Sequence, residues 1–143
     1  SEARLGGHRV LLAFPTTYMN DSGRSVVRLW RRGGKEDFDR LVIVHDELDL
    51  PPGRVKVKVG GGLAGHNGLR SVEAHLHTRD FTRVRIGVGK PPGGKEQGVG
   101  HVLSKTTGAT KELLAVAVVE AADAVELILT EGVDAAMARI NAR

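Results

Sequence analysis

The sequence predicts an α/β fold, a three-layer α/β/α sandwich around a central mixed β-sheet. Short apolar segments typical of buried strands alternate along the chain with segments whose apolar residues recur at helical spacing. A Pro-Pro-Gly turn between two strands suggests a hairpin, which would place an antiparallel strand in the sheet. The chain of 143 residues has the length of one domain, so we expect residues 1–143 to form a single domain.

The first half of the chain predicts two buried strands separated by a helix. Residues 10–14 (VLLAF) are continuously apolar, as in a strand of a parallel sheet, and Pro15 ends this run. Residues 41–44 (LVIV) have the same character and are predicted to end where a polar segment begins. Between the two strands, three residues are candidate caps of a helix with one apolar face: Asn20, Asp21 and Ser22.

The second half predicts two more strands and further helices. Residues 54–59 (RVKVKV) alternate strictly between basic residues and valines, and residues 83–89 (RVRIGVG) predict another strand. A helix is expected around residues 68–77. In the C-terminal part, Gly132 is expected to end a long helix and Asp134 to cap a final one. The long helix is predicted from an apolar stripe: Leu114, Val118, Ala121, Val125 and Ile128.

Composition excludes several classes of protein. The chain has no cysteine, which excludes a disulfide framework or a zinc–thiolate site and favours a reducing compartment. Neither a membrane-spanning apolar run nor the core of a signal peptide is present, so we expect a soluble, intracellular protein with no membrane partner. The net charge of +4 indicates a mild preference for polyanions.

The glycine-rich segment at residues 60–65 (GGGLAG) matches the G-x-G-x-x-G pattern between a strand and a helix. A dinucleotide site also requires an acidic residue about twenty positions later, where this chain has Arg83 and Arg85. A phosphate loop of the Walker type is excluded because no Gly-Lys-Ser/Thr follows. The glycines then indicate a tight turn, with His66 and Asn67 at the helix entrance; Asn67 could cap that helix or point outward.

The acidic segment at residues 45–49 (HDELD) has three possible interpretations. His45, Asp46 and Asp49 could bind a metal ion, although their spacing is loose. Asp46 could instead orient a histidine that acts as a general base. The third interpretation is a loop of solvated acids, which we adopt for Glu47; Asp46 lies at the strand end, where we expect burial.

A third polar segment follows the first predicted strand. Tyr18 and Met19 form an apolar pair beside the amide of Asn20. Because strand ends can meet at one edge of a sheet, the three segments together predict one polar site without metal or cysteine. Its members are Asn20, Asp46, His66 and Asn67.

Basic residues recur on particular strand faces and around one loop. Together they favour a phosphate-rich partner, and the aromatic content of 3% argues against extensive base stacking, so the backbone of a structured RNA fits best. They are Arg54, Lys56 and Lys58 on one strand, Arg83 and Arg85 on another, and Lys90 and Lys95 around the loop.

Four segments in this order resemble the signature motifs of bacterial peptidyl-tRNA hydrolase: FPTTYMNDSG, HDELDLPPG, GGGLAGHNGLRS and FTRVRIGVGKPPG. The resemblance spans about residues 10–105. It implies a cytoplasmic enzyme, usually monomeric, that hydrolyses the ester joining a peptide to the terminal ribose of tRNA. It also implies that the enzyme needs no metal or nucleotide cofactor and that its partner is peptidyl-tRNA or tRNA.

The resemblance also implies roles for particular residues. Asn20 would hold the water or the substrate carbonyl, and Asp46 would orient the catalytic histidine. Asn67 would bind the substrate near the scissile ester, with His66 in support. Tyr18 and Met19 would line the cleft for the terminal adenosine or the peptide. Gly65 would leave room for the terminal nucleotide, and four basic residues would contact the tRNA backbone: Arg85, Lys90, Lys95 and Lys105.

The sequence departs from the family pattern in two places. Phe14 stands where the family usually has a lysine, and the family's N-terminal strand, with the catalytic histidine in an Arg-His-Asn context, is expected to be missing before Val10. His8 precedes the first predicted strand and is a poor substitute. Two interpretations stay open: a peptidyl-tRNA hydrolase whose present chain lacks the histidine and is inactive, or a non-catalytic RNA-binding homologue.

Overall fold

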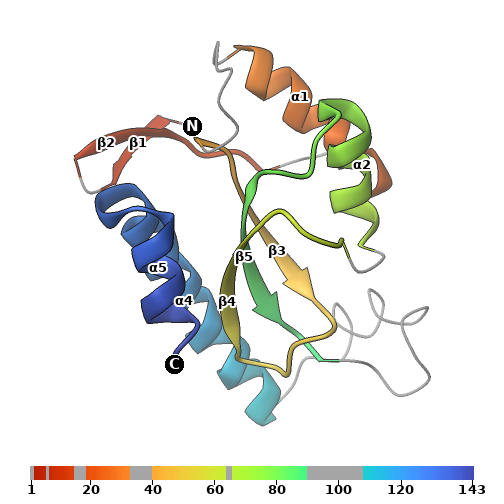
Figure 1. The fold of residues 1–143 in the computed structure, drawn as a ribbon. Coiled ribbons are helices and arrows are strands. Elements are labelled where there is room, and N and C mark those ends of the chain that lie inside the picture. The colour runs from red at the N-terminus through yellow and green to blue at the C-terminus, as the bar shows by residue number, and fades with distance from the viewer. Residues whose placement is uncertain (1, 6, 15–18, 33–39, 64–65, 90–107) are drawn as a thin grey trace. The chain divides into compact units, whose positions relative to one another are not determined.

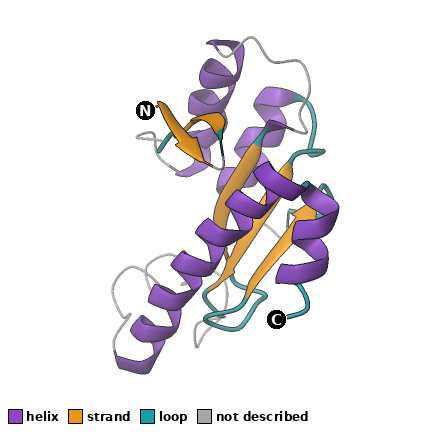
Figure 2. Ribbon diagram, turned by 90° about the vertical axis from the view of Figure 1, so that its left-hand side faces the viewer, coloured by secondary structure: helices purple, strands orange, loops and turns teal. Residues whose placement is uncertain are grey.

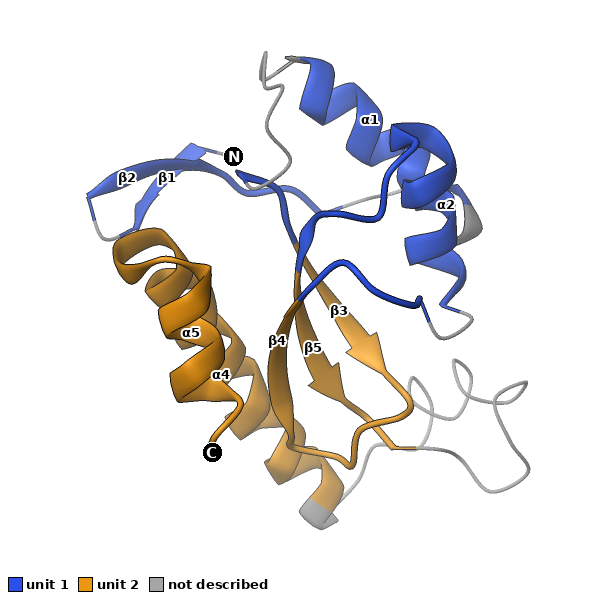
Figure 3. Ribbon diagram, viewed as in Figure 1, with its two compact units in different colours: residues 1–42, 59–82 blue, residues 43–58, 83–143 orange. Residues whose placement is uncertain are grey.

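The computed structural model describes residues 2–5, 7–14, 19–32, 40–63, 66–89 and 108–143, with the elements labelled in Figure 1. The chain divides into two compact units (Figure 3). Unit 1 comprises Ser1–Val42 and Val59–Thr82, and unit 2 comprises Ile43–Lys58 and Arg83–Arg143. None of the helices in the described ranges is long and apolar enough to cross a membrane.

Unit 1 begins with a β-hairpin. Strands β1 (Glu2–Leu5) and β2 (His8–Leu11) pair in antiparallel register, with Glu2 opposite Leu11 and Leu5 opposite His8. Gly7 has a φ of 83°, a conformation that glycine adopts without steric cost, and this allows the chain to reverse between the strands. The hairpin is a local structure, formed by residues a few positions apart.

The expectation of a buried strand at residues 10–14 is wrong. Strand β2 ends at Leu11, its partner is the antiparallel β1, and Phe14 is 94% exposed. The physical reason is that an apolar run indicates a strand without indicating its neighbours. Here the neighbour is the adjacent segment of chain, so the run lies in an exposed hairpin instead of a parallel sheet.

Two helices pack closely in unit 1: α1 (Ser22–Arg32) follows the short 3₁₀ helix η1 (Met19–Asp21), and α2 spans Asn67–Leu76. The backbone N–H of Gly23 donates to the Ser71 hydroxyl at 2.9 Å. A Cβ on Gly23 would overlap the carbonyl group of Ser71, so only glycine permits this approach. The buried apolar face of α2 consists of Leu69, Val72 and Leu76.

The main sheet contains β3 (Val42–Glu47), β4 (Val55–Val59) and β5 (Thr82–Gly87), in the order β3-β5-β4. Strands β3 and β5 are parallel, because residue numbers rise on both strands from one hydrogen bond to the next. The N–H of Thr82 donates to Leu41 O, and the N–H of Val88 donates to Glu47 O. Strands β5 and β4 are antiparallel, because residue numbers rise on one strand and fall on the other. The N–H of Gly87 donates to Arg54 O, and the N–H of Gly60 donates to Phe81 O. The predicted α/β class with a mixed sheet is therefore confirmed, but the expected hairpin at Pro-Pro-Gly is wrong, because β5 lies between β3 and β4.

Helices α4 (Gly108–Glu131) and α5 (Val133–Ile140) belong to unit 2 (Figure 3), and Figure 2 distinguishes the helices from the strands by colour. The break at Gly132 is confirmed, but Gly132 itself is the N-cap of α5, and Asp134 lies in its first turn. One member of the predicted stripe is misplaced, because Val118 is 59% exposed and Ala117 is buried instead. The C-terminus is tied to β4 by Asn141, whose side-chain amide donates to Val57 O and accepts from Val57 N–H, at 3.0 and 2.8 Å.

Candidate functional site

Strand β3 carries the acidic segment within the sheet. The strand continues to Glu47, beyond the predicted end at residue 44, because residues up to Glu47 still pair with β5. Side chains alternate along β3, so His45 and Glu47 share the buried face and Asp46, on the opposite face, is half-buried. The interpretation of Glu47 as a solvated acid is wrong, since this residue is buried.

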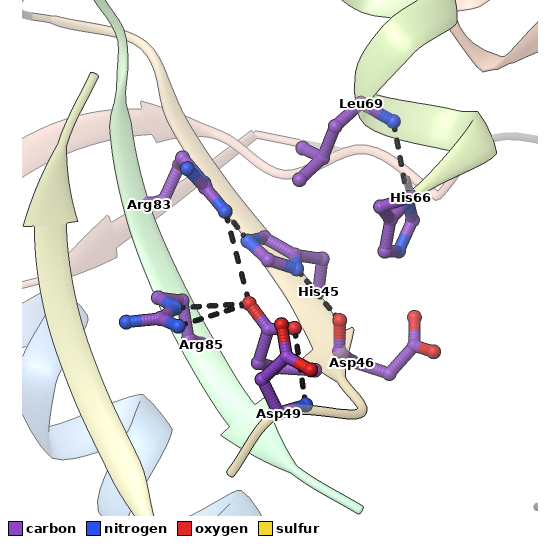
Figure 4. Close-up of polar contacts among 8 residues, drawn as sticks. His45, Asp46, Asp49, His66, Leu69, Arg83 and Arg85 are labelled. Atoms are coloured by element: carbon purple, nitrogen blue, oxygen red, sulfur yellow. Dashed lines mark hydrogen bonds and ion pairs between the residues drawn. The ribbon is translucent and has the colours of Figure 1, made fainter. Parts of the chain in front are cut away.

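Glu47 is buried because two arginines of β5 reach it (Figure 4). Its Oε1 accepts from Arg85 Nε at 3.1 Å and lies 3.0 Å from Arg85 Nη2 and 3.9 Å from Arg83 Nη2. Its Oε2 accepts from the Asp49 backbone N–H at 3.3 Å. Arg83 is only 1% exposed, and this burial, followed by the charge of Arg85, lowers the pKa of its guanidinium, whereas Glu47 acts in the opposite direction.

Both ring nitrogens of His45 have hydrogen-bond partners on this side of the sheet. Arg83 Nε lies 3.1 Å from His45 Nε2, and the backbone oxygen of Asp46 lies 2.8 Å from His45 Nδ1. A guanidinium only donates and a carbonyl oxygen only accepts, so His45 is neutral with its proton on Nδ1. The Nε2 lone pair is thus used by Arg83, which argues against His45 as a general base and as a metal ligand.

The metal interpretation finds no further support. Among the residues that the structure describes, no group of three or more histidine, cysteine, aspartate or glutamate side chains could hold a metal ion. Asp46 directs its carboxylate away from Arg83 and Arg85 (Figure 4). Its position on a half-exposed strand face suits a carboxylate that contacts another group of the site or the substrate.

In unit 1, His66 caps helix α2. Its Nδ1 accepts from the backbone N–H of Leu69 at 3.2 Å (Figure 4), so the neutral ring carries its proton on Nε2. The suggested capping role of Asn67 is wrong, because Asn67 is already the first residue of the helix and is exposed. The helix cap is therefore the side chain of His66 and not that of Asn67.

Met19 lies against the entrance of α2. A Cβ on the buried Gly68 would come within 2.8 Å of Met19 Sδ and 3.0 Å of His66 Cε1, so these two side chains meet over Gly68. Met19 is 47% exposed, which leaves much of its thioether accessible. The structure therefore brings together Met19, His66 and the first residue of α2. The backbone of Asn20 lies next to them in η1.

Several predicted site residues lie outside the described residues: Tyr18, Gly65, Lys90, Lys95 and Lys105. Arg85, a predicted tRNA contact, is described, and its side chain is 18% exposed and paired with Glu47. Asp46 belongs to unit 2, whereas Met19, Asn20, His66 and Asn67 belong to unit 1.

The sequence reasoning missed the buried polar cluster of His45, Glu47, Arg83 and Arg85. A signal for it exists in the period of the strands. His45 and Glu47 are two apart on β3, and Arg83 and Arg85 are two apart on β5, which places each pair on one face. Only the pairing of β3 with β5 brings the two pairs of residues together, and no local sequence pattern predicts that pairing.

The family model described as peptidyl-tRNA hydrolase matches residues 1–143. The chain belongs to this family. Peptidyl-tRNA hydrolases are enzymes, and this chain is accordingly a hydrolase. It is 45% identical to the peptidyl-tRNA hydrolase of Mycobacterium sp. (strain KMS), over 97% of this chain and 71% of that one. It is 46% identical to that of Nocardia farcinica, over 98% and 72%.

A solved structure of the peptidyl-tRNA hydrolase family has the same fold. The crystal structure of the Acinetobacter baumannii enzyme matches with a TM-score of 0.88 and 42% identity, covering 99% of this chain and 70% of that one. A match of this quality agrees with the α/β architecture built above.

Proposed function

We propose that the protein hydrolyses the ester bond between peptide and tRNA in peptidyl-tRNA and so recycles tRNA in the cytoplasm, as a monomer without metal or cofactor. The observation that carries this proposal is the match to a solved peptidyl-tRNA hydrolase, with 42% identity over 99% of the chain. The four motifs that first suggested the family include the described segments at β3 and at the start of α2.

Ester hydrolysis needs an activated water and a stabilised oxyanion. We assign Asp46 to orient the imidazole that activates the water, since a carboxylate fixes the tautomer of such a ring. Asn67 binds the substrate beside the scissile ester, and Asn20 holds the water or the carbonyl. His66 supports them as an Nε2–H donor, because its Nδ1 is used by the helix cap.

The remaining predicted residues bind the substrate. Met19 and Tyr18 form an apolar surface for the terminal adenosine or the peptide, and Gly65 leaves room for the nucleotide. Arg85 and the lysines contact phosphates of the tRNA: Lys90, Lys95 and Lys105. We also propose that both compact units belong to one domain, because each strand of the main sheet has residues in both units. One end residue of each strand lies in unit 1 and the rest of the strand lies in unit 2; these end residues are Val42 of β3, Val59 of β4 and Thr82 of β5.

The identity of the general base leads to a second candidate function. The basic lone pairs of His45 and His66 are both used within the fold, by Arg83 and by Leu69. If no other histidine serves, the chain binds peptidyl-tRNA or tRNA without turnover. This observation favours a non-catalytic RNA-binding homologue as the alternative.

One experiment separates the two candidates. Release of peptide from peptidyl-tRNA is measured with this chain and with a form extended upstream by its natural coding sequence, and circular dichroism establishes that both are folded. Turnover by either form supports hydrolysis. Failure of both folded forms would exclude hydrolysis, and salt-dependent binding of tRNA by these inactive forms would then establish the binding module.

A further inference from the structure

The buried polar cluster of His45, Glu47, Arg83 and Arg85 contains one residue, Arg83, of a type that is rare in the interior of a protein. Arg83 is among the largest fully buried side chains of the described residues, although arginine is almost never fully buried unless it is paired. Its charge faces Glu47 at 3.9 Å, but Glu47 is closer to Arg85, at 3.0 Å. The Arg83 guanidinium also donates a hydrogen bond from its Nε to His45 Nε2 at 3.1 Å.

This bond determines the state of the His45 ring. As a donor that has no lone pair to offer, Arg83 requires an unprotonated Nε2, and the proton of the neutral ring must then occupy Nδ1. That proton points at the backbone oxygen of Asp46, 2.8 Å from Nδ1 (Figure 4). The ring thus bonds to the peptide group that carries Asp46 along β3, on the sheet face opposite to the Asp46 side chain.

We propose that His45 is a positioning residue that holds Asp46 in place through its backbone carbonyl, and that Arg83 fixes the tautomer of His45 that makes this contact possible. The inference rests on the proposed function, in which Asp46 acts at the reacting ester. Glu47 and Arg85 complete the arrangement, since the Glu47 carboxylate is the acidic partner of both arginines on this side of the sheet.

Two substitutions of His45 separate its two hydrogen bonds. Asparagine places an amide nitrogen at the same number of bonds from Cα as Nδ1, so His45→Asn keeps a donor for Asp46 O and loses the contact with Arg83. Glutamine places an amide oxygen where Nε2 was, so His45→Gln keeps an acceptor for Arg83 and loses the donor. Both variants are uncharged, like the neutral ring; glutamine is close to histidine in size, whereas asparagine is smaller and leaves the space of the distal ring atoms empty.

The test combines a spectrum with kinetics. Long-range ¹H–¹⁵N correlation of the unsubstituted protein at neutral pH reports the His45 tautomer, and we expect a protonated Nδ1 with an unprotonated Nε2. The ¹³C shift of the Asp46 carbonyl is expected to change in His45→Gln and to stay near its original value in His45→Asn. In the form of the protein that turns over peptidyl-tRNA, kcat of His45→Gln should fall about tenfold below that of His45→Asn, the loss expected for one hydrogen bond, with similar KM.

The outcomes discriminate clearly. A proton on Nε2, or equal Asp46 carbonyl shifts in the two variants, would overturn the inference. Equal kcat values in two active, folded variants would do the same, because a purely structural ring would be replaced equally well by either amide. If no form turned over peptidyl-tRNA, the proposed function would fail, while the tautomer and the carbonyl shift would still decide whether His45 holds Asp46. Should both variants unfold, a proton on Nε2 of the unsubstituted protein would still overturn the inference, and a proton on Nδ1 would support it.

Discussion

Glu47 receives two arginine side chains from the neighbouring strand, and its own side chain is almost completely buried. A buried charge is stable only with partners, so removing one partner costs far more than the pair contributes overall. At the residue scale, the candidate site depends on this balance. The half-buried Asp46 lies on the opposite face of the same strand, and its proposed role at the reacting ester requires that β3 keeps its register.

We expect Glu47→Gln to lower the free energy of unfolding by about 3 kcal/mol, because it leaves Arg83 and Arg85 without a counter-charge in a buried place. Urea denaturation measures the change. The matched control is Glu131→Gln, which removes the carboxylate of an exposed ion pair with Arg139 and should cost less than about 1 kcal/mol. Equal losses in both variants would contradict the role of burial.

Asp46→Asn is expected to reduce kcat for peptidyl-tRNA hydrolysis by about a hundredfold or more, since an amide cannot orient and stabilise a protonated imidazole. The near-isosteric change on a half-buried face should leave the unfolding midpoint almost unchanged. Single-turnover peptide release measures the effect in the active form of the protein. Asp49→Asn, at an exposed position close by, serves as the control and should remain within about threefold of the original rate.

At the scale of elements, α2 is fixed at its N-terminus by His66 and along its side by α1. Each contact depends on one local choice of residue: an imidazole that accepts from the Leu69 N–H, and a glycine at the α1 crossing. The entrance of α2 carries Asn67, so the stability of this helix and the geometry of the proposed substrate contact are linked.

Replacement of Gly23 by alanine should destabilise the protein by about 2 kcal/mol or more, because the new methyl group meets the backbone carbonyl of Ser71, which cannot move alone. Thermal or chemical unfolding provides the measurement. Gly62→Ala is the control: its Cβ would have nothing within 4 Å, and the change is expected to be neutral or slightly stabilising. A neutral Gly23→Ala would show that α1 and α2 do not pack this closely.

The capping role of His66 can be separated from its role toward substrate. His66→Ala should cost about 1 kcal/mol through loss of the cap, and His66→Asn should retain stability because asparagine is a favoured N-cap. Both variants lose the Nε2–H donor. Lower activity in His66→Asn with full stability would place His66 in contact with substrate, and full activity would limit His66 to capping.

At the scale of the whole molecule, the net charge of +4 and the basic strand face predict electrostatic binding of tRNA. We expect log Kd to vary linearly with log salt concentration, with a slope corresponding to a few phosphate contacts, each contributing about 0.7 to 0.9. Lys56→Gln on β4 should reduce the slope by about one contact. Lys111→Gln, which removes an exposed charge at the start of α4, should leave it unchanged. A slope near zero would exclude phosphate-driven binding.

Local patterns predicted those parts of the fold that depend on neighbouring residues in the chain. The alternation in residues 54–59 and the helical spacing before Gly132 were sufficient for β4 and α4. The β1–β2 hairpin was missed because Glu2–Leu5 has no continuous apolar character, and the burial of Arg83 was missed because it depends on which strand lies beside β5. The family motifs named Asp46 and Asn67, but the hydrogen bonds that hold them required three-dimensional structure.

Strand β4 lies at one edge of the three-stranded sheet, and its central residue Val57 presents both backbone polar groups toward Asn141. The side-chain amide of Asn141 forms the same two hydrogen bonds with Val57 that a peptide group of a neighbouring strand would form. It occupies the N–H and the carbonyl of Val57, two of the backbone groups of β4 through which another polypeptide could otherwise add to the sheet. The short segment after α5 thus protects the protein against intermolecular β-pairing, and Asn141→Ala should reveal this as faster aggregation on storage at high concentration.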